Sequence, residues 1–289
     1  MANIKQLKIK IKATQGTLKI TSAMKLVSAA KFSKAQIAIT NSRPYAQELE
    51  SMVKDVSALV QNYSHQYLKS NEENKQSILL VIGADKGLCG GYNSQLSKKV
   101  LSFVKERTFD IKLNYVGKKV RDVVKNELNC GETYEFEKGE PSFNEVQKIA
   151  NELGALFSSG EIGRVFVAYN EFKSALTFVP TVKQVLPFSM DSEELEKFQE
   201  NYGTDFKYSP SPEEILDALI PETYVNTIYT CLLDAIAAEH GSRMTAMDSA
   251  TKNCEEAIRV QTIKMNKLRQ AAITTELIEV VSGAESLNN

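Results

Sequence analysis

The fold is decided by residues 221–286, PETYVNTIYTCLLDAIAAEHGSRMTAMDSATKNCEEAIRVQTIKMNKLRQAAITTELIEVVSGAES. Its proline stands at the start, where the first helical turn tolerates a missing N–H, and no other proline follows. Apolar residues recur at steps of three and four throughout. This pattern predicts one continuous helix from Pro221, preceded by a separate short helix over residues 212–219. At 1.5 Å per residue the long helix would span about 95 Å.

A helix of this length needs a partner helix, because one compact core cannot bury its whole apolar stripe. The first 60 residues offer that partner, since a heptad frame fits them. Its seam positions are Ile4, Leu7, Ile11, Thr14, Leu18, Thr21, Lys25, Ser28, Phe32, Ala35, Ile39, Ser42, Ala46, Leu49, Val53, Val56 and Val60.

The middle of this seam is polar. Between Thr21 and Ser28 we expect the frame to slip, so that Met24 and Val27 become the better seam residues. Pro44 is expected to kink the helix or to interrupt it for a turn.

Between the two helices the hydrophobic period changes to that of alternating strands and helices, which predicts a mostly parallel, doubly-wound (Rossmann-like) α/β domain. The expected fold class is therefore α/β with a long antiparallel coiled coil made by the two ends of the chain. The predicted domains are residues 1–60, 77–190 and 212–286. Strands are expected at 77–83, 110–117, 133–137, 163–172 and 176–188, the last two as a hairpin, and helices at 94–106, 118–128 and 142–157. Ser142 followed by Glu145 predicts a capping box at the start of the last of these helices.

Composition and charge exclude several classes of protein. Hydrophobic residues make up 43% of the 289, but no apolar run is long enough to cross a membrane. Four distant cysteines and two histidines form neither a zinc pattern nor a disulfide framework. Residues 1–47 carry eight lysines and Arg43 without an acid, which predicts an acidic partner around this helix. Nucleic acid is a poorer partner, because the helix has no aromatic or arginine-rich face.

The loop GADKGLCGG, residues 83–91, follows a predicted strand and precedes a helix, where a phosphate-binding loop would lie. It matches neither common nucleotide motif, since Lys86 precedes the glycine run. A tight glycine turn is the better interpretation, with Cys89 as a small buried residue. No nucleophile, base and orienting group come together, so catalytic, cofactor-binding and metal-binding residues are predicted to be absent.

The end of the long helix poses a separate problem. An antiparallel partner that ends at Met1 would leave the segment AAITTELIEVVSGAESL, residues 271–287, unpaired. An unpaired apolar helix end in water promotes aggregation unless another protein covers it. The sequence therefore predicts a socket for this tip.

Four stretches together resemble the gamma subunits of F-type ATP synthases, in order and over nearly the whole chain. They are ITSAMKLVSAAKFSKAQ from residue 20, DKGLCGGYN from 85, EHGSRMTAMDSATKN from 239 and KLRQAAITTELIEVVSGA from 267. The resemblance implies a non-catalytic central-stalk rotor of the bacterial type. It couples ion flow through the membrane c-ring of Fo to ATP synthesis or hydrolysis in a ring of three alpha and three beta subunits.

The same resemblance implies partners, a location and contact residues. The partners are the alpha and beta subunits, the epsilon subunit and the c-ring. The location is the cytoplasmic face of the bacterial inner membrane, peripheral and reached through the complex. The beta subunits would meet Met24, Lys25, Arg243, Gln270, Thr274 and Glu276, the bearing tip would be Ile273, Leu277 and Val281, and the foot on the c-ring would be Phe206, Lys207 and Tyr208.

Two alternatives stay open on the residues alone. The first is a coiled-coil adaptor that docks through its α/β domain. The second, weaker one is a nucleotide-binding enzyme that uses the 83–91 loop.

Overall fold

The computed structural model describes residues 2–57, 60, 63–69, 76–136, 141–188, 209 and 211–287. Two compact units form: residues 1–29 with 243–289, called the shaft unit here, and residues 30–242, called the domain unit. The two longest helices, α1 (Ala2–Ser57) and α6 (Pro212–Leu287), contribute to both units. Compact units therefore follow a different division from the predicted segments 1–60, 77–190 and 212–286.

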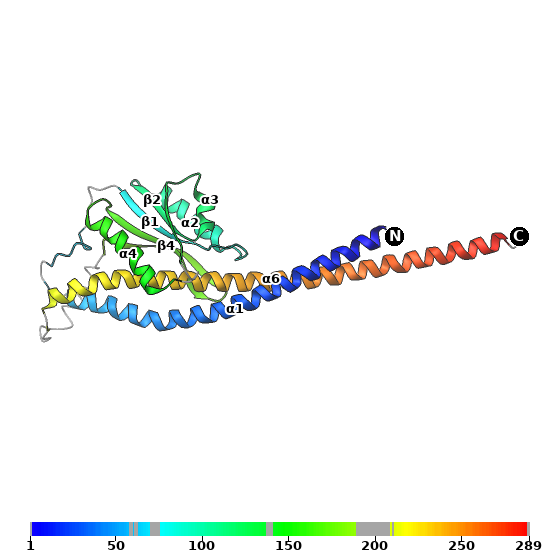
Figure 1. Cartoon of the computed structure of the whole chain (residues 1–289), viewed down its shortest axis with the longest axis horizontal. Coiled ribbons are helices and arrows are strands. Elements are labelled where there is room, and N and C mark those ends of the chain that lie inside the picture. Colours follow the sequence, from blue (N-terminus) through cyan, green and yellow to red (C-terminus); the bar gives the residue numbers. More distant parts are fainter. Residues whose placement is uncertain are drawn as a thin grey trace. The chain divides into compact units, whose positions relative to one another are not determined.

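The domain unit holds a five-stranded sheet in the order β3-β2-β1-β4-β5. Strands β2, β1 and β4 of this sheet are labelled in Figure 1. Strands β3, β2, β1 and β4 are parallel, and β5 is antiparallel to β4. This confirms the predicted doubly-wound domain and its terminal hairpin. The strands are β1 (Gln76–Ile82), β2 (Asp110–Val116), β3 (Cys130–Tyr134), β4 (Arg164–Ser174) and β5 (Thr177–Leu186).

Both faces of this sheet are covered, as the unbroken apolar run of β1 requires. Successive side chains of a strand point to opposite faces. Ile78 and Leu80 accordingly pack in one core, with α4 (Phe143–Ser158) and the first turns of α6. Leu79 and Val81 pack in the other, with α2 (Tyr92–Lys105) and α3 (Lys118–Val124).

Helix α4 begins with the predicted capping box. The Ser142 hydroxyl accepts from the Glu145 N–H, and the Glu145 carboxylate accepts from the Ser142 N–H, so two N–H groups that have no helical partner are satisfied. Replacing Ser142 with alanine should lower the free energy of unfolding of the domain unit by about 1 kcal/mol. Urea unfolding checks this, and a midpoint equal to that of the parent would contradict it.

Helix α6 begins at Pro212, nine residues before the expected start at Pro221. The predicted separate helix at 212–219 is therefore wrong, and Pro221 lies inside the helix. The Ser211 hydroxyl accepts from the Glu214 N–H at this start. Leu216 and Ile220 are fully buried in the core beneath the sheet. Their burial offsets the hydrogen bond that Pro221 cannot make.

Helix α1 keeps the predicted heptad frame throughout. Every predicted seam position from Ile4 to Val56 is buried or half-buried. The predicted slip is wrong, because Val27 is 59% exposed while Ser28 is buried. The helix also runs through Pro44 without the predicted interruption.

Candidate functional site

In the shaft unit, α1 and α6 pair antiparallel around a polar layer. The Thr251 hydroxyl donates to the Thr21 hydroxyl at 2.9 Å, and the Lys25 ammonium pairs with the Asp248 carboxylate. Asp248 also accepts from Lys252 at 2.7 Å. These contacts explain why the heptad frame does not slip: Thr21 and Lys25 have partners on the facing helix.

The Asp248 carboxyl is the most perturbed acid of this layer. Hydrogen bonds from Lys25 and then Lys252 lower its pKa to about 2. A carboxyl with a lowered folded-state pKa stabilises the folded state above its unfolded pKa, and that contribution disappears as the pH falls through the folded value.

Asp248→Asn removes this charge at every pH. At about pH 5 we expect amide hydrogens of residues 2–29 to exchange faster in the variant than in the parent. This difference should shrink as the pH falls through about 2, because only the parent has a carboxylate to protonate. Exchange rates corrected for the intrinsic effect of pH measure this. Identical protection at the higher pH would show that the pair does not hold the helices together.

Beyond this layer the apolar end of α6 is exposed, as predicted. Ile273, Leu277 and Val281 are 49%, 61% and 57% exposed. They follow one another at steps of four residues, so they form one stripe along the helix. Ile278 and Val280 are exposed beside them. Thr21 of α1 lies opposite Thr251 of α6. Followed from there along the antiparallel pair, α1 reaches its first residue before the exposed segment of α6 begins.

The predicted contact residues fall into three places. Lys25 belongs to the polar layer, Met24 precedes it in the chain, and both are half-exposed. Arg243, at the start of the α6 part of the shaft unit, is buried. Six further predicted residues lie on the exposed end of α6. Helical spacing places them within one half of the circumference of that helix. These six are Gln270, Ile273, Thr274, Glu276, Leu277 and Val281. The predicted foot, Phe206, Lys207 and Tyr208, lies outside the described residues.

The glycine loop after β1 packs against α6 of the domain unit. Its Cys89 carbonyl accepts from the Ser242 hydroxyl at 2.6 Å, and Tyr92, just after the loop, donates its hydroxyl to the Ala235 carbonyl at 3.1 Å. Cys89 and Tyr92 are both buried. Positive φ angles at Leu88 and Gly90 make the tight turn. The carboxyl ends of strands are common ligand positions in such sheets. Here the loop at the carboxyl end of β1 packs against α6 instead.

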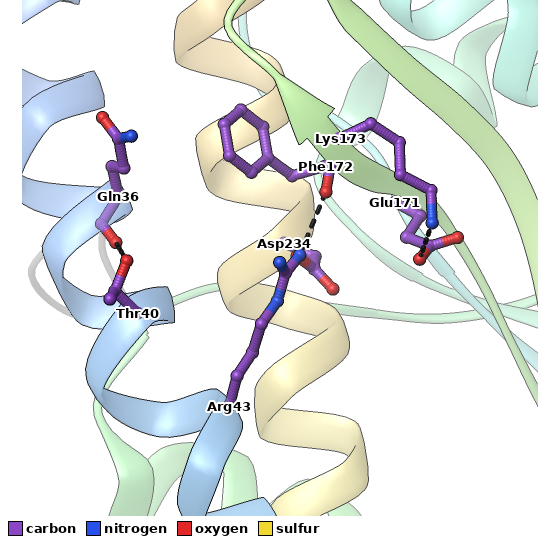
Figure 2. Close-up of polar contacts among 7 residues, drawn as sticks. All are labelled: Gln36, Thr40, Arg43, Glu171, Phe172, Lys173 and Asp234. Atoms are coloured by element: carbon purple, nitrogen blue, oxygen red, sulfur yellow. Dashed lines mark hydrogen bonds and ion pairs between the residues drawn. The ribbon is translucent and has the colours of Figure 1, made fainter. Parts of the chain in front are cut away.

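A partly buried ion pair joins the same helices to the sheet, and the sequence interpretation missed it. Arg43 of α1 contacts Asp234 of α6 at 2.7 Å and donates to the Phe172 carbonyl of β4 at 3.0 Å (Figure 2). Burial raises the pKa of the Asp234 carboxyl, and Arg43 opposes that rise. One signal was available: Asp234 is the one charged residue between Glu222 and Glu239.

The described part of the chain holds neither a cluster of metal ligands nor a candidate membrane span. No three His, Cys, Asp or Glu side chains in them gather as a metal site would require. Among the described helices, none has an 18-residue window apolar enough for a membrane span.

Comparisons with known proteins agree with this architecture. The family model described as ATP synthase matches residues 3–287. The ATP synthase gamma chain of Bdellovibrio bacteriovorus is 36% identical, over 99% of both chains, and that of Christiangramia forsetii is 38% identical over 100% of both.

Solved structures show the same fold. A chain of the Tetrahymena thermophila mitochondrial ATP synthase, from a structure of its central stalk and c-ring, is 25% identical with a TM-score of 0.59, over 80% of this chain and 99% of that one. A chain of the Euglena gracilis mitochondrial ATP synthase is 16% identical with a TM-score of 0.69, over 99% and 95%. Full-length identity to curated gamma chains, together with the shared fold, shows that this chain belongs to the gamma subunit family of F-type ATP synthases.

Proposed function

We propose that this chain is the central-stalk rotor of an F1Fo ATP synthase. It couples ion flow through the membrane c-ring to ATP synthesis or hydrolysis in a ring of alpha and beta subunits. The observation that carries the proposal is the exposed apolar stripe Ile273, Leu277 and Val281, at the end of a helix in a chain of the gamma family. A likeness at 25% identity to a central-stalk chain supports it.

The exposed stripe is the bearing tip of the rotor, seated in an apolar socket of the ring. On full burial each of the three aliphatic side chains would gain at most about 1.5–3 kcal/mol, so the isolated tip favours a partner. Apolar contact has no preferred direction, which suits a surface that must turn through equivalent positions.

The beta subunits contact the shaft through their acidic lever loops. Met24, Lys25 and Arg243 form one part of this contact, and Gln270, Thr274 and Glu276 form the other. The absence of acids from residues 1–47 supports an acidic partner. Each orientation of an asymmetric shaft stabilises a different set of beta-subunit conformations, so turning the shaft shifts the populations of open and closed sites.

The domain unit faces the membrane side of the complex, with the epsilon subunit as a partner and Phe206, Lys207 and Tyr208 as the foot on the c-ring. The chain itself is non-catalytic, because packing against α6 occupies the loop where a phosphate would bind. It sits at the cytoplasmic face of the bacterial cell membrane and reaches the membrane indirectly, through the complex.

Affinity purification tests this proposal against the coiled-coil adaptor. The tag belongs after Asn126, in an exposed turn of the domain unit, because both helix ends would be enclosed by the ring. We expect the alpha, beta and epsilon subunits and the c-ring to purify with the chain, in a complex that hydrolyses ATP. Recovery of the chain without the alpha and beta subunits would contradict the rotor and favour the adaptor.

A further inference from the structure

In one core cluster of the domain unit, α1 and α6 contribute several small apolar side chains to the contact with the sheet and its loops. Ala35 of α1 and Ala237 and Ala238 of α6 are buried in a cluster with Phe172 and Tyr92. Small side chains allow close approach, but contacts of this kind have no directional component. Apolar packing by itself resists separation of two surfaces better than it resists sliding of one over the other.

Directional contacts cross the same junction, and Arg43 makes two of them. Its guanidinium joins α1, α6 and β4 through Asp234 and the Phe172 carbonyl (Figure 2). The carboxylate side chain is 7% exposed and the arginine 41%. The planar guanidinium presents its N–H groups in a rigid fork, so two acceptors on different elements fix its orientation.

Two further directional contacts lie on α6. Tyr92 at the start of α2 donates to the carbonyl of Ala235, one residue after Asp234. Ser242 donates to the Cys89 carbonyl, about two helical turns further on. Helix α6 is therefore held at both ends of this interval, and Arg43 adds α1 to the same network.

We propose that Arg43 is a positioning residue that transmits torque between the helix pair and the α/β domain, through a clamp made of Arg43, Asp234 and the Phe172 carbonyl. The inference rests on the proposed rotor function and adds to it the residues that make the rotor torsionally stiff. Without the clamp the helices stay packed, but the domain turns more freely about them.

The test measures angular fluctuation in the assembled complex. A particle is attached to a cysteine introduced at exposed Lys99 on α2, after serine has replaced the two half-buried cysteines, Cys130 and Cys254. The width of the particle's angular distribution about its rest position, recorded without ATP, reports the torsional stiffness between ring and domain. ATP-driven rotation of the same particle reports the proposed function separately.

The informative variant is the double replacement Arg43→Met with Asp234→Leu. It keeps an apolar junction of similar volume, which often leaves stability unchanged, yet removes the bonds to Asp234 and Phe172. Arg43→Met alone is the companion, and Ser142→Ala is the control, because it weakens the same domain through a cap internal to α4.

We expect the angular distribution to widen in both Arg43 variants and to keep its parental width in Ser142→Ala. A double variant as narrow as the parent would overturn the clamp, because stability would then explain any effect of the single variant. A parent complex whose particle does not rotate with ATP would instead overturn the proposed function, while the fluctuation width would still decide on the clamp.

Discussion

Replacing Arg43 with methionine should lower the free energy of unfolding of the domain unit by about 3 kcal/mol. Removing one partner of a buried pair leaves the other charge unpaired at a cost of about 3–5 kcal/mol, and the partial exposure of Arg43 places this case at the low end. Adding Asp234→Leu should recover most of the loss, because no buried charge remains.

The loss should also depend on pH. Burial already raises the pKa of Asp234, and removing Arg43 raises it further. A carboxyl whose folded pKa lies above its unfolded value, about 3.9, destabilises the folded state increasingly as the pH rises between the two. The deficit of the single variant should therefore be largest at neutral pH and shrink as the pH approaches about 4.

Tyrosine fluorescence during urea unfolding measures both effects. All eleven tyrosines lie between residues 45 and 229, so the signal reports the domain unit. A single variant that unfolds at the same urea concentration as the parent would show that the ion pair adds nothing. A double variant less stable than the single one would show that Asp234 makes a further stabilising contact besides the one with Arg43.

Replacing both Leu277 and Val281 with glutamate should abolish assembly of the complex. The expected reason is that two unpaired charges would enter an apolar socket, where each costs several kcal/mol or more. The alanine pair is the matched control. It removes apolar area at a cost of at most about 1.5–3 kcal/mol per side chain, so assembly should weaken only modestly and rotation should persist.

Folding can be separated from assembly in this experiment. Both side chains are more than half exposed in the free chain, so neither pair should change its circular dichroism. The yield of purified complex and the ATP-driven ion pumping then show whether the tip is seated in an apolar socket. If the glutamate pair assembles and pumps as well as the alanine pair, the tip is not seated in an apolar socket.

Much of the fold could be predicted because it depends on local pattern. Short apolar runs located the strands, apolar residues at steps of three and four located the long helices, and the Ser142–Glu145 pair located the start of α4. Proline was less informative. Pro221 indicated a helix start, but burial of Leu216 and Ile220, which no local rule reveals, extended the helix back to Pro212.

Contacts between distant residues were the harder part. The polar stretch around Lys25 indicated a slip of the heptad frame because Asp248, its partner, lies 223 residues away. The Arg43–Asp234 pair is likewise separated by 191 residues, and neither residue belongs to a motif. The exposed tip was predictable because it depends only on the relative lengths of two helices.

Observation of single complexes shows whether this chain turns inside the ring. The ring is fixed to a surface and a particle is attached to the α/β domain at Lys99→Cys, an exposed position on α2. With ATP present, we expect stepwise rotation of the particle in one direction, and we expect it to stop when ATP is removed. A complex that hydrolyses ATP while the particle stays at one angle would contradict the proposed rotor function.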